Sequence, residues 1–177
     1  KLIGSDTRTD LALLAIKGKT VSHVTIGNSE SLRIGDWGVS VTNPHGISAK
    51  LGIGIISATP TAEFGEPLFQ LDRSFGSVSG GALFNLRGEF IGLHSTAFQF
   101  SQNTSTVIPS NYIQKIINDL QTYGQVSRGW LGLQYQTITK SIAKQLHLKS
   151  TRGVLVTNVF KNSPADSNGI KRGDIII

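Results

Sequence analysis

Cysteine is absent from the sequence. Its absence excludes disulfide bonds, thiol catalysis and cysteine-based metal sites, but it does not fix the compartment, because an oxidising space also accepts cysteine-free chains. Long apolar runs are absent too, since no stretch approaches the ~20 residues of a membrane span. We therefore expect these residues to be soluble, with any signal peptide or anchor upstream of them.

Histidine is scarce, and its pattern excludes the usual metal sites. His23, His45 and His147 are isolated, without a His, Asp or Glu neighbour at the spacing of metal ligands. Ordinary surface or packing roles explain them best. We expect no metal.

A concentrated patch of basic and aromatic residues is also lacking, although the net charge is +6. Residues 1–125 carry nine basic and nine acidic side chains, whereas residues 126–177 carry eight basic side chains against Asp166 and Asp174. The basic residues of the second segment are spread out and are not interleaved with aromatic ones, so nucleic acid is not an expected partner. The change in composition predicts a domain boundary near residue 125.

The length and the ends of the sequence predict a fragment. A chain of 177 residues is long for one compact domain and short for two. It begins with Lys1, contains no methionine and ends on the apolar run "GDIII". We therefore expect one full unit and one partial unit, cut at both ends. With 38% apolar residues and 20 glycines, the composition favours a folded, β-rich protein.

The first segment predicts short strands followed by one helix. Apolar runs bounded by glycine and polar turns predict strands at 11–17, 38–44, 52–58, 68–72, 81–85, 89–95 and 105–109. Such regular spacing is typical of a barrel or a sandwich. Apolar residues at helical spacing predict a helix over 110–123, and Gly124 is its stop signal. After it we expect a strand in 126–136, a helix that begins at Thr137 or Thr139, a strand at 153–160 and a capped helical turn ended by Gly169.

The stretch "SGGALFNLRGEFIGLHS" could carry a nucleophile, because two glycines after Ser79 let the backbone bend sharply beside a substrate. Serine and glycine also dominate ordinary turns, so the three residues alone favour a simple hairpin start. The function therefore depends on the surrounding sequence.

Six blocks in order resemble the HtrA/Deg family of serine proteases across essentially the whole chain: "GSDTRTDLALLAIK", "SLRIGDWGVSVTNPHG", "GIGIISA", "SGGALFNLRGEFIGLHSTA", "VIPSNYIQKIINDLQTYGQVSRGWLGL" and "NSPADSNGIKRGDIII". The resemblance implies an all-β fold, a chymotrypsin-like double β-barrel of which the first barrel is only partly present. Residues 1–125 would be the trypsin-like protease domain, truncated at its N-terminus. Residues 126–177 would be the start of a PDZ domain.

The resemblance assigns the catalytic roles. Ser79 matches the nucleophile, and Asp10, in "TDLALL", matches the aspartate that orients and stabilises the histidine. The family's histidine precedes the aspartate, so the base would lie upstream of Lys1. His94 follows the serine, and we interpret it as a cleft-lining or packing residue, not as the base.

The sequence departs from the family around this centre. Ser77 and Val78 replace Gly-Asn before Ser79, the preceding loop is one residue shorter, and Thr42 stands where glycine is common. Backbone N–H groups at Ser77, Val78 and Ser79 would form the oxyanion hole, and a serine at the glycine position adopts the required backbone at a cost. Because a lost oxyanion donor lowers turnover ~10²–10³-fold, a decayed or repurposed protease is the alternative.

The second segment resembles the opening of a PDZ domain. The run Trp130, Leu131, Gly132 and Leu133 lies where such domains capture a peptide's terminal carboxylate, and the next strand edge would accept the peptide. An ordinary glycine-bearing strand start is the simpler interpretation. The local basic surplus would attract a carboxylate in a salt-sensitive way.

The resemblance to the HtrA/Deg family implies an ATP-independent serine endopeptidase of protein quality control. The resemblance implies unfolded or misfolded polypeptides and peptide C-termini as partners, trimer-based assembly and no cofactor. It also implies a periplasmic or envelope location in a bacterium, or an organelle in a eukaryote. The alternative is a catalytically impaired relative that acts as a chaperone or peptide sensor, and a plain peptide-binding module is a weaker third interpretation.

Overall fold

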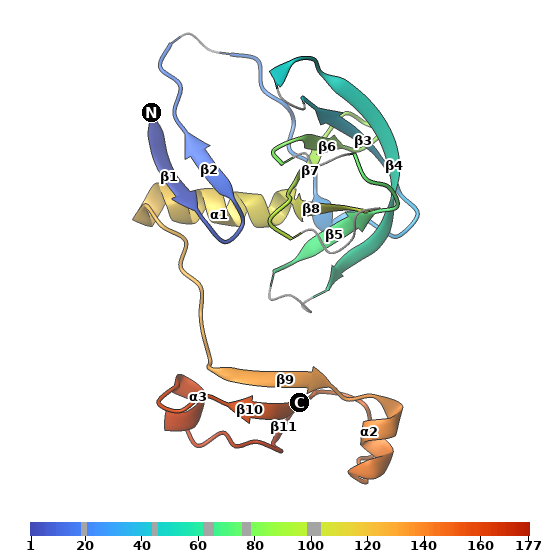
Figure 1. Ribbon diagram of the computed structural model, residues 1–177, viewed down its shortest axis with the longest axis vertical. Helices are drawn as coiled ribbons and strands as arrows, with labels where there is room; N and C mark the ends of the chain where they lie inside the picture. Colours follow the sequence, from blue (N-terminus) through green and yellow to red (C-terminus); the bar gives the residue numbers. More distant parts are fainter. Residues whose placement is uncertain (19–20, 44–45, 62–65, 76–78, 99–103) are drawn as a thin grey trace. The chain divides into compact units, whose positions relative to one another are not determined.

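The computed structural model describes residues 1–18, 21–43, 46–61, 66–75, 79–98 and 104–177. They form two compact units, Lys1–Ser127 and Arg128–Ile177, shown in Figure 1. In these described ranges, no helix combines the length and the apolar character that a membrane crossing needs. The assignment of the second unit to a PDZ domain stays a prediction.

A closed six-stranded antiparallel barrel dominates the first unit, with the strand order β3-β4-β5-β8-β7-β6 (Figure 1). Its strands are β3 (Trp37–Thr42), β4 (Lys50–Thr61), β5 (Leu68–Leu71), β6 (Ala82–Phe84), β7 (Phe90–His94) and β8 (Ser105–Pro109). β3 returns to pair with β6, with Ser40 opposite Leu83, and this pairing closes the barrel. Closure leaves no free sheet edge between the strands.

Alternation along the strands separates the barrel interior from its outer face. In β3, Gly38, Ser40 and Thr42 are buried, whereas the alternate residues are partly or largely exposed. The interior core consists of apolar side chains that are almost fully buried: Ile56, Phe69, Leu71, Leu83, Ile91 and Val107. This layer holds the strands that carry the site.

A hairpin and a helix complete the first unit. β1 (Leu2–Asp6) pairs antiparallel with β2 (Leu11–Leu14). Figure 1 shows α1 (Ser110–Tyr123) running from the barrel, where it follows β8, to the hairpin. Leu11 of β2 packs with Ile113 of the helix in a second apolar cluster. At the far end, a Cβ atom on Gly4 would lie 3.0 Å from the Gly124 carbonyl oxygen, so β1 lies directly against the end of the helix.

The start of α1 is fixed to a segment more than 80 residues earlier. The short 3₁₀ helix η1 (Ser29–Ser31) donates from the Ser29 amide to the Asn111 side chain at 3.1 Å, and the Asn111 amide donates back to Ser29 Oγ at 3.0 Å. The Ser110 hydroxyl donates to the Gly27 carbonyl at 2.7 Å. These bonds satisfy N-terminal groups of the helix, which has no side-chain cap at Pro109.

The second unit is a three-stranded antiparallel sheet, in the order β11-β10-β9, with two short helices. Its elements are β9 (Leu133–Thr137), α2 (Lys140–Gln145), β10 (Val154–Val159), α3 (Pro164–Ser167) and β11 (Ile175–Ile176). The buried apolar residues are Ile138, Ala143, Val156 and Ala165. Among the strands described, β9 has a neighbour on one side only.

The strands and helices agree closely with those predicted from the sequence. The seven strands predicted in the first segment correspond to β2–β8, and the helix at 110–123 has the predicted bounds. Gly88, in the turn between β6 and β7, has φ 75°. Of the two candidate starts for the second helix, the structure selects Thr139, whose side chain accepts from the Ile142 amide. β1 was not predicted, because "LIGSD" is short and has little alternation.

One buried polar pair lies within the barrel. His94 is 3% exposed, and its Nε2 is 2.5 Å from Ser40 Oγ. The ring of Phe75 meets the imidazole edge-on, with 5.4 Å between the ring centroids. Burial lowers the pKa of His94 to about 4, because the charged imidazolium is poorly solvated there. His94 is thus a neutral packing residue at neutral pH.

The barrel has no room for a side chain at Gly92. A Cβ atom there would lie 2.6 Å from the Ile108 carbonyl oxygen, which is backbone and cannot rotate away. We expect Gly92→Ala to lower the free energy of unfolding by about 1–3 kcal/mol, measured by urea denaturation. Gly129→Ala is the matched control, because a Cβ atom at Gly129 would meet nothing within 4 Å. Equal stability of the two variants would contradict the close approach.

The low pKa of His94 predicts a pH-dependent loss of stability. The folded pKa of about 4 lies below the ordinary value of 6.5, so the unfolded chain binds the proton more readily. The contribution is fully present above pH 6.5 and is lost as the pH falls through 4, by about 3 kcal/mol in total. His94→Gln should flatten the urea-derived stability curve over this interval. An unchanged slope would contradict a buried neutral imidazole.

Candidate active site

Ser79 is followed at a sharp corner of the chain by Gly80 and Gly81, and only glycine fits at these two positions. Gly80 has φ 82°, a left-handed conformation that side chains other than glycine rarely adopt. Gly81 meets a steric limit instead, because a Cβ atom would lie 2.7 Å from Thr42 Cγ2 and 3.3 Å from the Val41 carbonyl oxygen. The two glycines therefore serve different purposes, and together they leave Ser79 exposed at the barrel surface.

The corner is bound to β7 by two main-chain hydrogen bonds. The Gly80 amide donates to the His94 carbonyl, and the His94 amide donates to the Gly81 carbonyl, each at 2.8 Å. Both bonds involve the backbone of the buried His94. The position of Ser79 is thus set by a strand of the barrel.

Asp10 ends the tight turn between β1 and β2. Its φ of 56° is left-handed, a conformation that aspartate tolerates better than most residues. Within the turn, the Thr9 hydroxyl donates to Asp6 Oδ2 at 2.5 Å and the Thr9 amide donates to the same oxygen at 3.3 Å. Thr9 is fully buried and Asp6 nearly so. The turn is thus held from inside and presents the Asp10 carboxylate outward.

The structure brings Ser79 and Asp10 together. The Ser79 hydroxyl donates to Asp10 Oδ2 at 3.4 Å, across 69 residues of sequence. An imidazole between them would need two hydrogen bonds of about 2.7–3.0 Å in addition to the width of the ring. The direct contact therefore occupies the place of a bridging base, and one of the two exposed side chains would have to rotate to admit it.

The described histidines do not supply that base. His94 is turned into the barrel, where it binds Ser40. His23 is exposed in the segment before η1, and His147 belongs to the second unit. His45 lies outside the described residues. The interpretation of His94 as a packing residue agrees with its burial.

The rest of the predicted oxyanion hole cannot be placed. Ser77 and Val78 lie outside the described residues, and of this set only Ser79 is described. Thr42, which stands where the family often has glycine, is 5% exposed and packs beneath Gly81. This departure from the family pattern therefore fills space under the nucleophile's corner. Within the described ranges, no group of three acidic, histidine or cysteine side chains could hold a metal ion.

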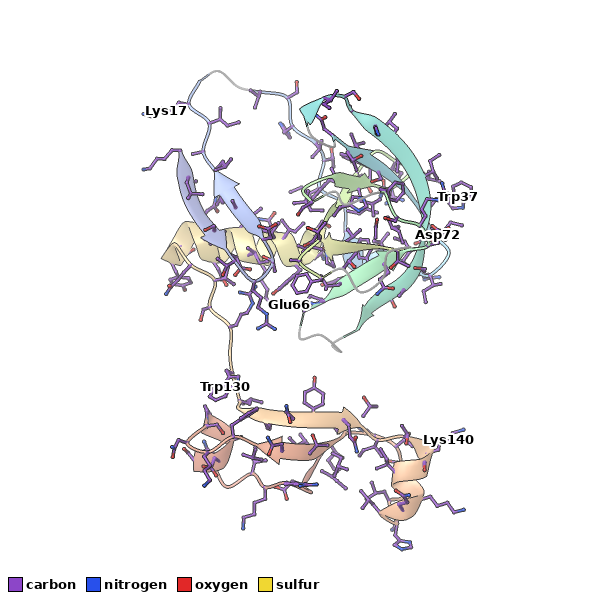
Figure 2. All side chains as sticks on the ribbon, viewed as in Figure 1. Lys17, Trp37, Glu66, Asp72, Trp130 and Lys140 are labelled. Carbon is purple, nitrogen blue, oxygen red and sulfur yellow. The ribbon has the colours of Figure 1, made fainter. Side chains whose placement is uncertain are left out.

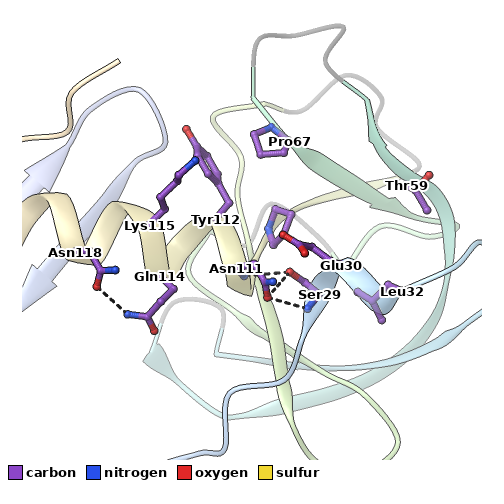
Figure 3. A pocket seen from close by; sticks show the side chains of 11 residues that line it. Ser29, Glu30, Leu32, Thr59, Pro67, Asn111, Tyr112, Gln114, Lys115 and Asn118 are labelled. Atoms are coloured by element: carbon purple, nitrogen blue, oxygen red, sulfur yellow. Dashed lines mark hydrogen bonds between the residues drawn. The ribbon is translucent and has the colours of Figure 1, made fainter. Parts of the chain in front are cut away.

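A cavity of about 700 Å³ lies between η1, the start of α1 and the β4–β5 region (Figure 3). The residues lining it are Ser29, Glu30, Leu32, Thr59, Pro67, Pro109, Asn111, Tyr112, Gln114, Lys115 and Asn118. Neither Ser79 nor Asp10 lines it. The cavity is thus separate from the candidate catalytic pair.

The predicted peptide-binding residues form a connected segment of the second unit. Trp130 and Leu131 are each 62% exposed, and Gly132 has φ 73°. The Leu131 carbonyl accepts from the Ala165 amide at 2.8 Å, and the Gly132 carbonyl accepts from Phe160 at 2.9 Å. The segment is therefore fixed through its carbonyl groups, directly before the open edge of β9, which begins at Leu133.

Comparison with known proteins identifies the fold and the family. A model of the trypsin-like peptidase domain matches residues 1–93, more than half of the chain. Two solved structures of the HtrA-type protease AlgW are similar. The complex with a tripeptide has a TM-score of 0.81 and 34% identity over 99% of this chain and 61% of that one. The complex with a decapeptide has a TM-score of 0.72 and 33% identity over 98% and 56%. The chymotrypsin-like fold predicted from the sequence is thus confirmed.

Curated relatives are similar along the whole chain. A probable periplasmic serine endoprotease, DegP-like, from Pseudomonas putida strain GB-1 is 38% identical over 100% of this chain and 39% of its own length. The protein of the same name from Hahella chejuensis is 37% identical over the same shares. The chain thus spans about 39% of the length of these relatives. With the closed barrel and the Ser79 corner, these matches show that the chain belongs to the trypsin-like peptidases and, among them, to the HtrA/Deg serine proteases.

Proposed function

We propose that this chain carries the nucleophile and the triad aspartate of an ATP-independent serine endopeptidase. The observation that supports this most directly is the approach of the Ser79 hydroxyl to the Asp10 carboxylate at 3.4 Å. Two residues so far apart in the sequence, assigned by motif alone, face each other at the barrel surface. The names of the relatives support the same class of reaction.

In this mechanism, Ser79 Oγ attacks the scissile carbonyl and forms an acyl-enzyme, which water then hydrolyses. The proton of the hydroxyl passes to an imidazole, which the family resemblance places upstream of Lys1, and then to the leaving amine. Asp10 would orient this imidazole and stabilise its cation. Backbone N–H groups at Ser77, Val78 and Ser79 would bind the oxyanion.

The setting of the reaction is also a proposal. The DegP-like relatives are named periplasmic endoproteases, which supports a periplasmic location here. We propose unfolded or misfolded polypeptides as substrates, trimer-based assembly and no cofactor, as the family resemblance implies. These properties belong to a protein longer than the present sequence.

A second candidate function is a catalytically impaired relative that binds unfolded chains. One observation favours it: the replacement of Gly-Asn by Ser77 and Val78 directly before the nucleophile. Such a protein would keep its scaffold and its peptide-binding surface while turnover falls.

Active-site labelling separates the two functions. We expect the protein expressed from its complete coding sequence to react with a fluorophosphonate probe, because only an activated serine attacks phosphorus at a useful rate. Ser79→Ala should abolish labelling, and Asp10→Asn should lower the labelling rate by orders of magnitude. In-gel fluorescence with time gives the rates.

Ser141→Ala is the control for this experiment, because Ser141 is an exposed residue of α2 in the second unit. Its labelling should equal that of the unaltered protein. A folded protein that is not labelled in the presence of denatured casein would exclude the endopeptidase and leave the binding function.

We also propose that the Trp130–Leu133 segment and β9 bind the C-terminus of a peptide. The open edge of β9 offers main-chain groups for an added strand, and the segment before it is already held by its carbonyls. The neighbouring basic surplus favours a carboxylate. This proposal is independent of whether Ser79 is active.

Peptide binding can be measured by fluorescence anisotropy with a labelled apolar heptapeptide. We expect the free carboxylate form to bind about tenfold or more tightly than its C-terminal amide, because charge-assisted hydrogen bonds are lost in the amide. The difference should shrink as salt is added. Equal affinity of the two peptides would rule out carboxylate capture.

A further inference from the structure

The described residues include an ion pair with one buried partner, outside the Ser79–Asp10 pair. Arg8 Nε lies 2.6 Å from Glu66 Oε1, and the two side chains are 50% and 1% exposed. Glu66 Oε2 accepts a hydrogen bond from the hydroxyl of Tyr112. Figure 2 labels Glu66 just before β5. A buried carboxylate is costly to desolvate, and Arg8 and Tyr112 compensate for the water that Glu66 loses.

These contacts join three segments that are far apart in the sequence. Arg8 belongs to the turn between β1 and β2, Glu66 precedes β5 of the barrel, and Tyr112 is in the first turn of α1. The Tyr112 ring also forms a wall of the cavity of Figure 3. Glu66 therefore connects the hairpin turn to both the barrel and the helix through its two carboxylate oxygens.

The turn that Arg8 belongs to is the one that carries Asp10. Asp10 has φ 56°, and a left-handed residue other than glycine persists only when its surroundings determine the backbone. The buried Thr9–Asp6 bonds hold the turn from within. The Arg8–Glu66 pair joins the turn to the segment just before β5 of the barrel.

We propose that Glu66, acting through Arg8, is a positioning residue that fixes the turn presenting Asp10 to Ser79. The role as a catalytic positioning residue rests on the proposed endopeptidase function. Glu66 itself touches neither Ser79 nor Asp10 in the described contacts. Its effect is to hold the triad aspartate at a fixed distance from the nucleophile, and small displacements at such a site lower the rate strongly.

The test compares Glu66→Gln with the unaltered protein expressed from its complete coding sequence. Glutamine keeps the size of the side chain and an acceptor for Tyr112, but it lacks the charge that holds Arg8. We expect kcat on a chromogenic peptide to fall about 10- to 100-fold with KM unchanged. The acidic limb of the pH–kcat/KM profile should move to lower pH, because a displaced Asp10 stabilises the imidazolium less.

Double substitution tests whether Glu66 acts through Arg8. Arg8→Met alone should lower kcat as much as Glu66→Gln, and the double variant should be no worse than either, because both remove the same contact. Arg8 is half exposed, so Arg8→Met also provides a second variant if Glu66→Gln does not fold. Glu89→Gln is the matched control, since it breaks the exposed Arg87–Glu89 pair on the β6–β7 turn and should leave both readouts unchanged.

Two results would overturn the proposal while the endopeptidase stands: a folded Glu66→Gln protein with kcat and acidic limb within twofold of the unaltered protein, or additive losses in the double variant. Hydrogen exchange at the Thr9 amide tests the fixed turn even if the proposed endopeptidase function fails. If the unaltered protein hydrolyses no peptide, the endopeptidase fails. Faster exchange in Glu66→Gln than in Glu89→Gln would then still support the fixed turn, and equal exchange would overturn it.

Discussion

The backbone pairing between β7 and the Ser79 corner is the constraint on which the site depends. Two hydrogen bonds at 2.8 Å hold Gly80 and Gly81 against His94, and they form only because neither glycine carries a Cβ atom. The imidazole of His94 is simultaneously fixed by Ser40 inside the barrel. The exposed hydroxyl is thus attached to a buried residue of the barrel, so an accessible group is also held rigidly.

The Asp10 side of the Ser79–Asp10 pair is built differently. Asp10 comes from a two-stranded hairpin, and such a hairpin is at best marginally stable by itself in water. Its order here comes from α1, from the Asp6–Thr9 bonds and from the contact of Arg8 with Glu66. One half of the candidate pair belongs to a closed barrel, and the other half depends on what packs against it.

The fold could be predicted from the sequence because its signals are local. Apolar runs bounded by glycine and polar turns located the barrel strands, and Gly124 marked the end of α1 with the left-handed φ that the helix stop requires. The ordered motifs identified Ser79 and Asp10 as candidates, but they did not predict the distance between the two side chains. Nothing local marked Glu66 as buried, because its partners Arg8 and Tyr112 lie 58 and 46 residues away. The packing of Thr42 beneath Gly81 was equally invisible, since it depends on the closure of β3 against β6.

Helix α1 contacts the hairpin both near its start, through Ile113, and just after its C-terminal end, at Gly124, and it contacts the η1 segment at its beginning. Gly4 lies against Gly124, while Ser110 and Asn111 bind Gly27 and Ser29. The helix therefore holds the contacts at its two ends a fixed distance apart, at about 1.5 Å for each of its residues. Inserting or deleting one residue within it would rotate its apolar face by about 100° and detach the hairpin from its support. The length of this helix therefore helps to set where the hairpin, and with it Asp10, is held.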